Sequence, residues 1–352
     1  MTRQFSRVGS VTDDFFRSWI NAREQRLAER DSIRVCAFDW GVEALELVPG
    51  FECCAGSSEL EVLREANQRW LRNKAAFFAY QTPSDFKLSG SSLQFSSPVK
   101  SLYRENDTVY AHYFECRQAR GRALLVLPHW NAAAGSYASF CRFLNWLGFS
   151  ALLVTLPYHG DRKPLECIGA EYSVSPNLGR TIACARQGVI DTLCCADWLT
   201  QQGYAQIGIV GSSLGFGHAF VASALDERLR VNVFNHCCST VSDALWAGMP
   251  RFRAELEAHI SQQELRECWS VINPISYFHE FARFPKQSIL ILGRYDTTFV
   301  RDYVEEGIQP FRTMGLDHQV VELACGHRTI GDAPYLVLSA YHIGAFLKKN
   351  LR

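Results

Sequence analysis

A serine centred between two glycines stands at position 213, in the segment Gly211-Ser212-Ser213-Leu214-Gly215. The segment matches G-x-S-x-G, and it lies between the apolar run Ile207–Val210 and the helical run Phe216–Leu225. A nucleophile on such a tight strand-to-helix turn takes strained dihedral angles, which glycine at both ends makes sterically possible. The pattern predicts Ser213 as a nucleophile, with the Leu214 N–H at the start of a helix as an oxyanion donor.

A phosphate-binding loop is the main rival interpretation of this turn, because glycine-rich turns after a strand also bind dinucleotides. The G-x-G-x-x-G register lacks its third glycine after Gly215, and the segment has no P-loop lysine. The next strand ends in Val233-Phe234-Asn235-His236, without the acidic residue of a dinucleotide site. These departures disfavour the rival.

A serine hydroxyl needs a base to take its proton, and the base is usually oriented by a carboxylate. Asp296 follows the apolar run Ser288–Leu292, and His327 follows the run Gln319–Leu323. The ends of parallel strands meet at one edge of a sheet, so these side chains are expected to converge on Ser213. The sequence therefore predicts His327 as the general base and Asp296 as the orienting acid.

Simpler roles stay open for these two residues. Asp296 could cap a helix that starts near Phe299, and His327 could be a loop histidine without a task. Asp243, soon after the preceding strand, is the second candidate for the acid.

A second oxyanion donor is expected in the loop His129-Trp130-Asn131, directly after the run Ala123–Pro128. Esterases often carry His-Gly at this position, and the N–H of the following residue points into the site. That register predicts the Asn131 N–H as the donor. Because Trp130 replaces the glycine, the choice between the Trp130 and Asn131 amides stays open, and Trp130 is also a candidate for substrate contact.

Composition indicates a globular, enzyme-sized chain. It has 352 residues, of which 47% are hydrophobic and 20% charged, which excludes a disordered or fibrous protein. The 36 basic and 36 acidic residues cancel, so no overall field attracts nucleic acid or an anionic membrane. We expect a small-molecule partner and one main domain with additions.

The cysteines and the N-terminal residues bear on compartment. The 13 cysteines are odd in number and form no C-x-x-C pattern, and the adjacent pairs, such as Cys53-Cys54, read as reduced thiols. Thr2-Arg3-Gln4 and Asp13-Asp14 interrupt any apolar signal region, and no apolar stretch is long enough to span a bilayer. We expect a cytoplasmic protein without a metal or other cofactor.

Residues 1–94 read as a partly helical N-terminal extension. They include an Arg- and Glu-rich run over Arg17–Arg34 and an amphipathic helical pattern over Ser58–Tyr80. A serine-rich stretch then leads to two alternating segments, 99–103 and 108–116, which predict a β-hairpin.

Residues 95–352 show buried apolar runs alternating with helical patterns. Besides the strand runs already given, these are strands at 151–156 and 231–234 and helices ending at 147, spanning 178–202 and spanning 334–348. Such alternation predicts an α/β fold with a mostly parallel sheet and helices on both faces. Within residues 239–284 the strands stop and an aromatic, helical stretch predicts a cap insertion.

This order of strands, nucleophile turn, late Asp and later His resembles the α/β-hydrolase superfamily. Within it, the loop Pro157-Tyr158-His159-Gly160-Asp161-Arg162-Lys163-Pro164, followed by Asp197-Trp198-Leu199 and Gly203-Tyr204, is similar to the abhydrolase-domain-eighteen family. That resemblance implies a serine hydrolase acting on carboxylic esters or acyl lipids. Two alternatives stay open: a non-catalytic binding protein on the same fold, and a serine peptidase.

The same loop carries positive charge. Arg162, together with Lys163 and Arg180, could hold a carboxylate or phosphate of the substrate. The alternative is that Arg162 only pins the loop through backbone carbonyls.

Overall fold

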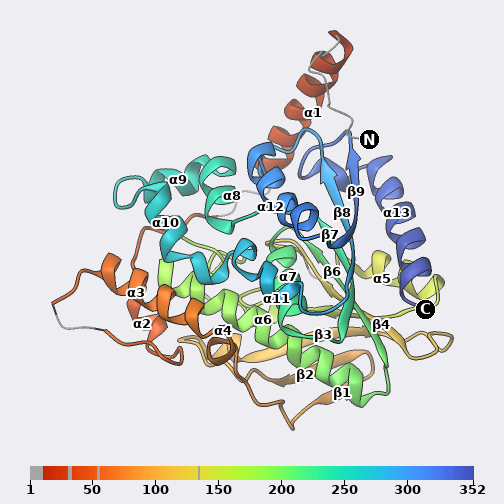
Figure 1. Ribbon diagram of the computed structural model, residues 1–352, viewed down its shortest axis with the longest axis horizontal. Helices are drawn as coiled ribbons and strands as arrows, with labels where there is room; N and C mark the ends of the chain where they lie inside the picture. Colours follow the sequence, from red (N-terminus) through yellow and green to blue (C-terminus); the bar gives the residue numbers. More distant parts are fainter. Residues whose placement is uncertain (1–10, 31–33, 54–55, 134) are drawn as a thin grey trace.

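The computed structural model describes residues 11–30, 34–53, 56–133 and 135–352. Its centre is a nine-stranded sheet in the order β1-β2-β3-β5-β4-β6-β7-β8-β9 (Figure 1). The strands are β1 (Lys87–Ser89), β2 (Ser92–Ser96), β3 (Thr108–Phe114), β4 (Arg122–Leu127), β5 (Ser150–Val154), β6 (Gln206–Ser212), β7 (Leu229–Asn235), β8 (Gln287–Gly293) and β9 (Asp317–Leu323). The strands from β5 to β9 in this order pair in parallel, whereas β1, β2 and β3 add antiparallel pairs at one edge.

Helices connect the strands and cover both faces of the sheet. The α-helices are α1 (Val11–Arg30), α2 (Val42–Leu45), α3 (Glu59–Arg72), α4 (Lys74–Phe77), α5 (Ala138–Trp146), α6 (Leu178–Gln201), α7 (Leu214–Leu225), α8 (Val241–Gly248), α9 (Pro250–Leu256), α10 (Gln262–Cys268), α11 (Phe278–Phe281), α12 (Arg301–Thr313) and α13 (Tyr335–Asn350). Short 3-10 helices are η1 (Arg104–Asp107), η2 (Gly160–Arg162), η3 (Ser270–Ile272), η4 (Pro274–Tyr277) and η5 (Thr329–Gly331).

The central strands are apolar on both sides because both sides are buried. In β4, Leu124 and Val126 face the core under α5 and α13, whereas Leu125 and Leu127 face the core under α6 and α7. Alternate side chains of a strand point to opposite faces, so a strand covered twice reads as a continuous apolar run. The mostly parallel α/β architecture expected from the sequence is the one observed.

The expected hairpin is wrong in its first strand. The partner of β3 is β2, with Phe95 opposite Val109, whereas residues 99–103 are not in the sheet. The polar side chains explain the difference: Asp107 accepts hydrogen bonds from the N–H and hydroxyl of Ser101, which fold this segment into a turn before β3.

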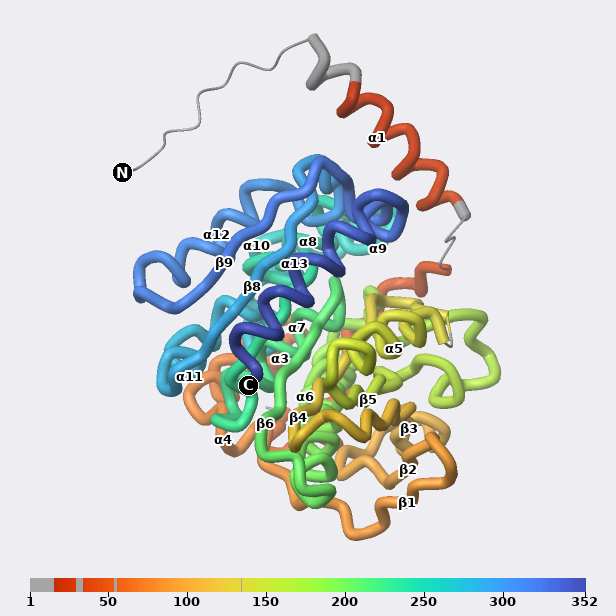
Figure 2. Tube along the Cα trace, turned by 90° about the vertical axis from the view of Figure 1, so that its right-hand side faces the viewer, coloured from red at the N-terminus to blue at the C-terminus, as the bar shows by residue number. Residues whose placement is uncertain are grey.

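In the N-terminal segment, α1, α3 and the strand pair β1–β2 are attached to the rest of the molecule in different ways. Its residues 1–10 lie outside the described residues. α1 projects from the body in both views (Figures 1 and 2), whereas α3 packs Leu63 and Trp70 into the main core. β1 and β2 belong to the sheet, so the expected boundary after residue 94 falls inside β2.

Residues 239–284 contain no strand and fold into α8 through α11 with η3 and η4, between β7 and β8. Among the described residues, no helix combines the length and the apolar character needed to cross a membrane. Twelve cysteines in the described parts are free thiols, and Cys54 lies outside them.

Candidate active site

Ser213 sits on the sharp turn between β6 and α7. It has φ 53° and ψ −113°, a strained conformation for a residue with a side chain. A Cβ on Gly211 would lie 2.5 Å from the Gly215 carbonyl oxygen, and one on Gly215 would lie 2.4 Å from the Leu127 carbonyl oxygen. The two glycines therefore let the turn close against β4, and Leu214 becomes the first residue of α7.

Three side chains distant in sequence meet at this turn. The Ser213 Oγ lies 2.8 Å from the His327 Nε2, and the His327 Nδ1 lies 2.8 Å from the Asp296 Oδ2. Asp296 follows β8 and His327 follows β9, so both come from the carboxyl edge of the sheet. The arrangement forms a continuous path for a proton from hydroxyl to imidazole, backed by a carboxylate.

The Asp296 carboxylate is almost completely buried and is bonded on both oxygens. Its Oδ1 accepts hydrogen bonds from the N–H groups of Thr298 and Phe299, each at 2.8 Å. Asp296 therefore also caps the turn near Phe299, which was the simpler role left open for it. Burial alone would raise the pKa of this carboxyl, but His327 and His236 together lower it below its usual range. Asp296 is therefore ionised and can stabilise a protonated imidazole.

A second histidine, His236, lies against the same carboxylate and was not among the expected site residues. Its Nδ1 is 3.0 Å from the Asp296 Oδ2, the same oxygen that the His327 Nδ1 faces. His236 follows β7 directly, at φ 56°, and is buried. Its position after a central parallel strand was the only sequence signal that could have suggested it.

Asp243, the second candidate for the acid, binds other side chains and not His327. Its carboxylate accepts hydrogen bonds from Thr240 and from the Gln262 Nε2, the latter at 2.7 Å, and pairs with Arg266 at 3.3 Å. These partners belong to α8 and α10 and their flanks, so the carboxylate beside His327 is that of Asp296.

The Asn131 N–H does not fit its expected role in this conformation. It donates to the His159 Nε2 at 2.9 Å, while the His159 Nδ1 lies 2.9 Å from the Pro157 carbonyl oxygen. The carbonyl fixes the proton on Nδ1 and leaves Nε2 as the acceptor. Burial lowers the pKa of His159 to about 4, which keeps the ring neutral. The Asn131 assignment is corrected on this ground, and the Trp130 N–H is the remaining candidate in the loop.

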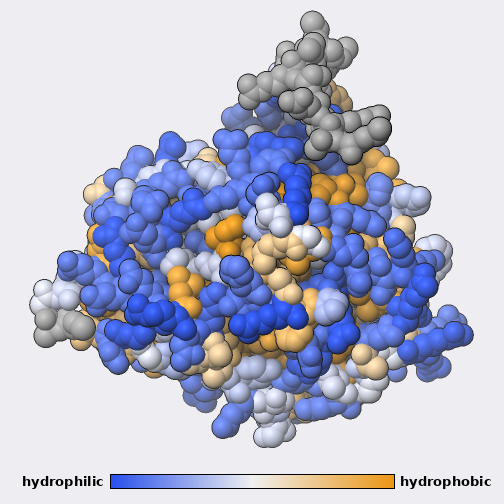
Figure 3. Space-filling model, in the orientation of Figure 1, coloured by the Kyte–Doolittle hydropathy of each residue, from blue (hydrophilic) through white to orange (hydrophobic). Residues whose placement is uncertain are grey.

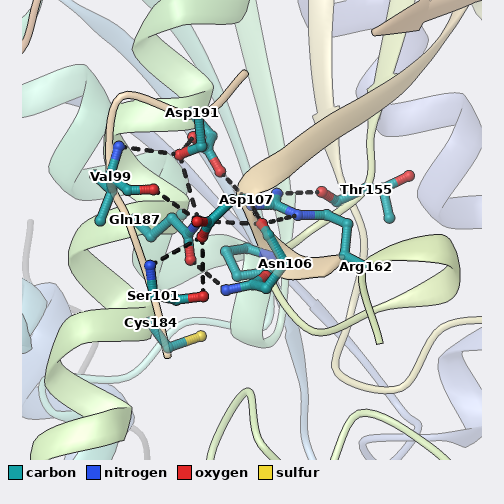
Figure 4. Close-up of polar contacts among 12 residues, drawn as sticks. Val99, Ser101, Asn106, Asp107, Thr155, Arg162, Cys184, Gln187 and Asp191 are labelled. Atoms are coloured by element: carbon teal, nitrogen blue, oxygen red, sulfur yellow. Dashed lines mark hydrogen bonds and ion pairs between the residues drawn. The ribbon is translucent and has the colours of Figure 1, made fainter. Parts of the chain in front are cut away.

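Arg162 is not placed to contact a substrate. It is fully buried, and its guanidinium donates to the carbonyl oxygens of Asn106 and Thr155 and pairs with Asp191 at 2.7 Å (Figure 4). Figure 4 shows Arg162 beside Asn106 and Asp191, with Gln187 on the other side of Asn106. The expected substrate contact of Arg162 is therefore wrong, and its role is the alternative one: it pins the loop 157–164 to η1, to the end of β5 and to α6.

A cavity of about 570 Å³ opens around Ser213 and His327. Trp130 lines it, and its Nε1 donates to the Ala170 carbonyl oxygen at 2.9 Å, which fixes the indole. Apolar walls come from Leu245 of α8 and from Ile343 of α13. Near the N-terminal end of α13 apolar side chains also gather on the surface (Figure 3), where Leu336 is exposed. The cavity suits a ligand with an apolar portion next to the serine.

Among the described residues, His236, Asp296 and His327 form the one group of three or more potential metal ligands whose ligand atoms all lie within 4.8 Å of one another. A cation bound there would have to replace the hydrogen bond between His327 and Asp296. The contact of the His327 Nε2 with a serine hydroxyl fits proton transfer better than metal ligation.

Solved structures resemble this chain in fold. Acetyl xylan esterase 1 from Thermoanaerobacterium sp. JW/SL YS485 is 12% identical, with 86% of this chain and 96% of that chain covered and a TM-score of 0.54. The Pyrococcus furiosus esterase Pf2001 is 16% identical, with 78% and 93% covered and a TM-score of 0.52. The α/β hydrolase GrgF from Penicillium sp. sh18 is 14% identical, with 75% and 99% covered and a TM-score of 0.52.

The α/β-hydrolase fold expected from the sequence is confirmed by these likenesses and by the sheet topology. No model of a protein family matches the chain, and no curated protein matches it.

Proposed function

We propose that this chain, an α/β-hydrolase by its fold, is a serine esterase that cleaves carboxylic esters with an apolar acyl portion. The observation that carries the proposal is the pair of 2.8 Å contacts joining the Ser213 Oγ, the two nitrogens of His327 and the Asp296 carboxylate. The proposal also has support from the esterases among the structures of similar fold.

In the proposed reaction the Ser213 Oγ attacks the ester carbonyl while the His327 Nε2 takes the hydroxyl proton. Asp296, held ionised, stabilises the imidazolium that forms. The tetrahedral intermediate collapses to an acyl-enzyme, and the imidazolium gives its proton to the leaving alcohol. Water, deprotonated by His327, then attacks the acyl-enzyme, and the carboxylic acid leaves as Ser213 regains its proton.

The developing oxyanion needs backbone donors near the serine. We propose the Leu214 N–H, which is at the first position of α7, where an amide has no acceptor within the helix. For the second donor we propose the Trp130 N–H, because the Asn131 N–H donates to His159. In this scheme His159 holds the loop that presents Trp130.

The proposal also includes a family and a cellular location. Membership of the abhydrolase-domain-eighteen family rests on the loop 157–164, whose Arg162 has the buried partners of Figure 4. A cytoplasmic location agrees with the free thiols of the described cysteines, since a reducing compartment keeps thiols unpaired.

Labelling by a fluorophosphonate probe tests the proposal directly. The wild-type protein is expected to be labelled, Ser213→Ala is not, and Ser212→Ala serves as the matched control that keeps the nucleophile. Hydrolysis of p-nitrophenyl esters of increasing acyl length then measures the apolar preference. A folded wild-type protein that takes no label and turns over no ester would favour the non-catalytic alternative.

A further inference from the structure

One residue of the projecting helix α1 reaches the loop that carries the base. The N-terminal end of α1 projects from the rest of the molecule (Figures 1 and 2), whereas Glu24, further along the helix, is only 3% exposed. A carboxylate loses its hydration when it is buried, and such burial is tolerated only where strong hydrogen bonds replace the water. The partners of Glu24 therefore indicate what this residue does.

Within the described parts of the chain, the Glu24 carboxylate accepts hydrogen bonds from the two residues that follow His327. Its Oε1 accepts the Arg328 N–H at 3.0 Å and the Thr329 N–H at 2.7 Å, and its Oε2 accepts the Arg328 N–H at 3.0 Å. On the other side of the histidine, a Cβ on Gly326 would lie 2.5 Å from the Glu24 Oε1. Glu24 thus packs against the backbone on both sides of His327.

Backbone contacts also hold this loop to the sheet edge: the Tyr295 N–H donates to the Cys325 carbonyl oxygen at 2.9 Å. The Gly326 N–H donates to the Thr329 Oγ1 at 2.8 Å, which closes the loop on itself, and the bonds to Glu24 attach it to α1. A charged acceptor bonded to two adjacent amides sets both the position and the orientation of their peptide planes. The backbone of His327 is therefore fixed on both sides, by the Arg328 and Thr329 amides and by Gly326.

We propose that Glu24 is a positioning residue of the active site, which holds the His327 loop so that the imidazole meets both Ser213 and Asp296. The inference rests on the proposed esterase function. It makes the C-terminal half of α1 part of the catalytic unit rather than an appendage. Other contacts of α1 attach the helix without touching the loop amides: Ile20 is buried in the core under α13, and Arg23 pairs with Asp332 at 3.0 Å.

Variants of the full-length chain test this role. Glu24→Ala removes the acceptor, and Glu24→Asp keeps the charge but shortens the side chain by one methylene, so it cannot reach both amides. Glu24→Gln keeps one oxygen that can accept both N–H groups. Arg23→Ala is the matched control, because it weakens the attachment of α1 and leaves the Glu24 contacts intact. The measurements are kcat and KM for p-nitrophenyl butyrate and the rate of fluorophosphonate labelling, each well below the thermal midpoint of the variant.

We expect Glu24→Ala and Glu24→Asp to lower kcat and the labelling rate by about ten- to a hundredfold, because a small misplacement of a catalytic group has an effect of this size. KM should change by less than about threefold, since Glu24 lies behind the loop and not in the cavity. Glu24→Gln should recover most of the rate, and Arg23→Ala should keep it. If Glu24→Ala does not fold, the Asp and Gln variants still give the comparison.

Wild-type rates in folded Glu24→Asp, or an equal loss of kcat in Arg23→Ala, would overturn the inference. Failure of the esterase function itself looks different, because then the wild-type protein neither labels nor turns over ester.

Discussion

The imidazole rings of His236 and His327 lie against each other, with centroids 4.5 Å apart and planes inclined by 34°. Both turn Nδ1 toward the Asp296 Oδ2, at 3.0 and 2.8 Å. Burial, and then the neighbouring His327, lower the pKa of His236, so this ring is neutral. One carboxylate oxygen therefore faces two imidazoles, of which only His327 reaches the serine.

His236→Phe is expected to shift the pH dependence of kcat/KM. The phenyl ring keeps the stacking but removes the Nδ1 group that shares the carboxylate, so Asp296 attracts a protonated His327 more strongly. A base that holds its proton more tightly works only at higher pH, so the midpoint of the profile should move to higher pH. The measurement is kcat/KM for a p-nitrophenyl ester across the neutral range. An unchanged or lowered midpoint would show that His236 has no electrostatic effect on the base.

Asp296→Asn should lower kcat on the order of 10⁴-fold, as the equivalent change does in other triads. The amide can keep the bonds from Thr298 and Phe299, but it neither fixes the His327 tautomer nor stabilises its charged form. Asp243→Asn is the matched control, and kcat should fall less than about tenfold because this carboxylate pairs with Arg266. The opposite order of effects would move the acid role to Asp243.

Stability should fall as the pH drops from about 6.5 toward 4. Burial lowers the pKa of His159 and of His218 to about 4 each, whereas an unfolded histidine titrates near 6.5. Between these values the unfolded chain binds more protons than the folded chain, so the free energy of unfolding decreases as the pH is lowered. At pH 5 each histidine should cost on the order of 2 kcal/mol relative to pH 7.

The measurement for this third prediction is urea unfolding at several pH values. His218→Gln keeps a donor for the Leu214 carbonyl oxygen but cannot take a proton. The free energy of unfolding of this variant should therefore fall less with decreasing pH than that of the wild type, by the contribution of one histidine. A curve for His218→Gln that runs parallel to the wild-type curve would refute the assignment to His218.

The positions of Ser213, Asp296 and His327 could be predicted because each one follows an apolar run that becomes a parallel strand. Strand ends meet at one edge whatever the details of packing, so the order along the chain was sufficient to bring these residues together. Residues whose surroundings depend on loop conformation could not be predicted in this way. The acceptor of the Asn131 N–H is His159, from a loop whose shape depends on buried bonds to Asn106. The same limit applies to Glu24, because no periodic pattern shows which end of an exposed helix docks.

The last prediction concerns the buried pair of Arg162 and Asp191. It distinguishes an Arg162 that pins the loop 157–164 from an Arg162 that binds substrate. Both side chains are at most 1% exposed, so removing one partner leaves an unpaired charge in the core. Arg162→Met should therefore lower the free energy of unfolding by about 3–5 kcal/mol, while KM for p-nitrophenyl esters stays close to the wild-type value. The measurements are urea unfolding and steady-state kinetics on the same preparation.

The double variant Arg162→Met, Asp191→Leu should recover part of the lost stability, because two apolar side chains of similar size leave no uncompensated charge. The recovery should be incomplete, because Arg162 also donates to the carbonyl oxygens of Asn106 and Thr155. In both variants the Asn106 oxygen keeps only the bond from Gln187, and the Thr155 oxygen loses the bond from Arg162. A substrate-binding arginine would give the reverse pattern: Arg162→Met would raise KM for anionic esters with little change in unfolding, and Asp191→Leu would restore nothing. Such a result would return Arg162 to the substrate site and would require the loop to open in solution.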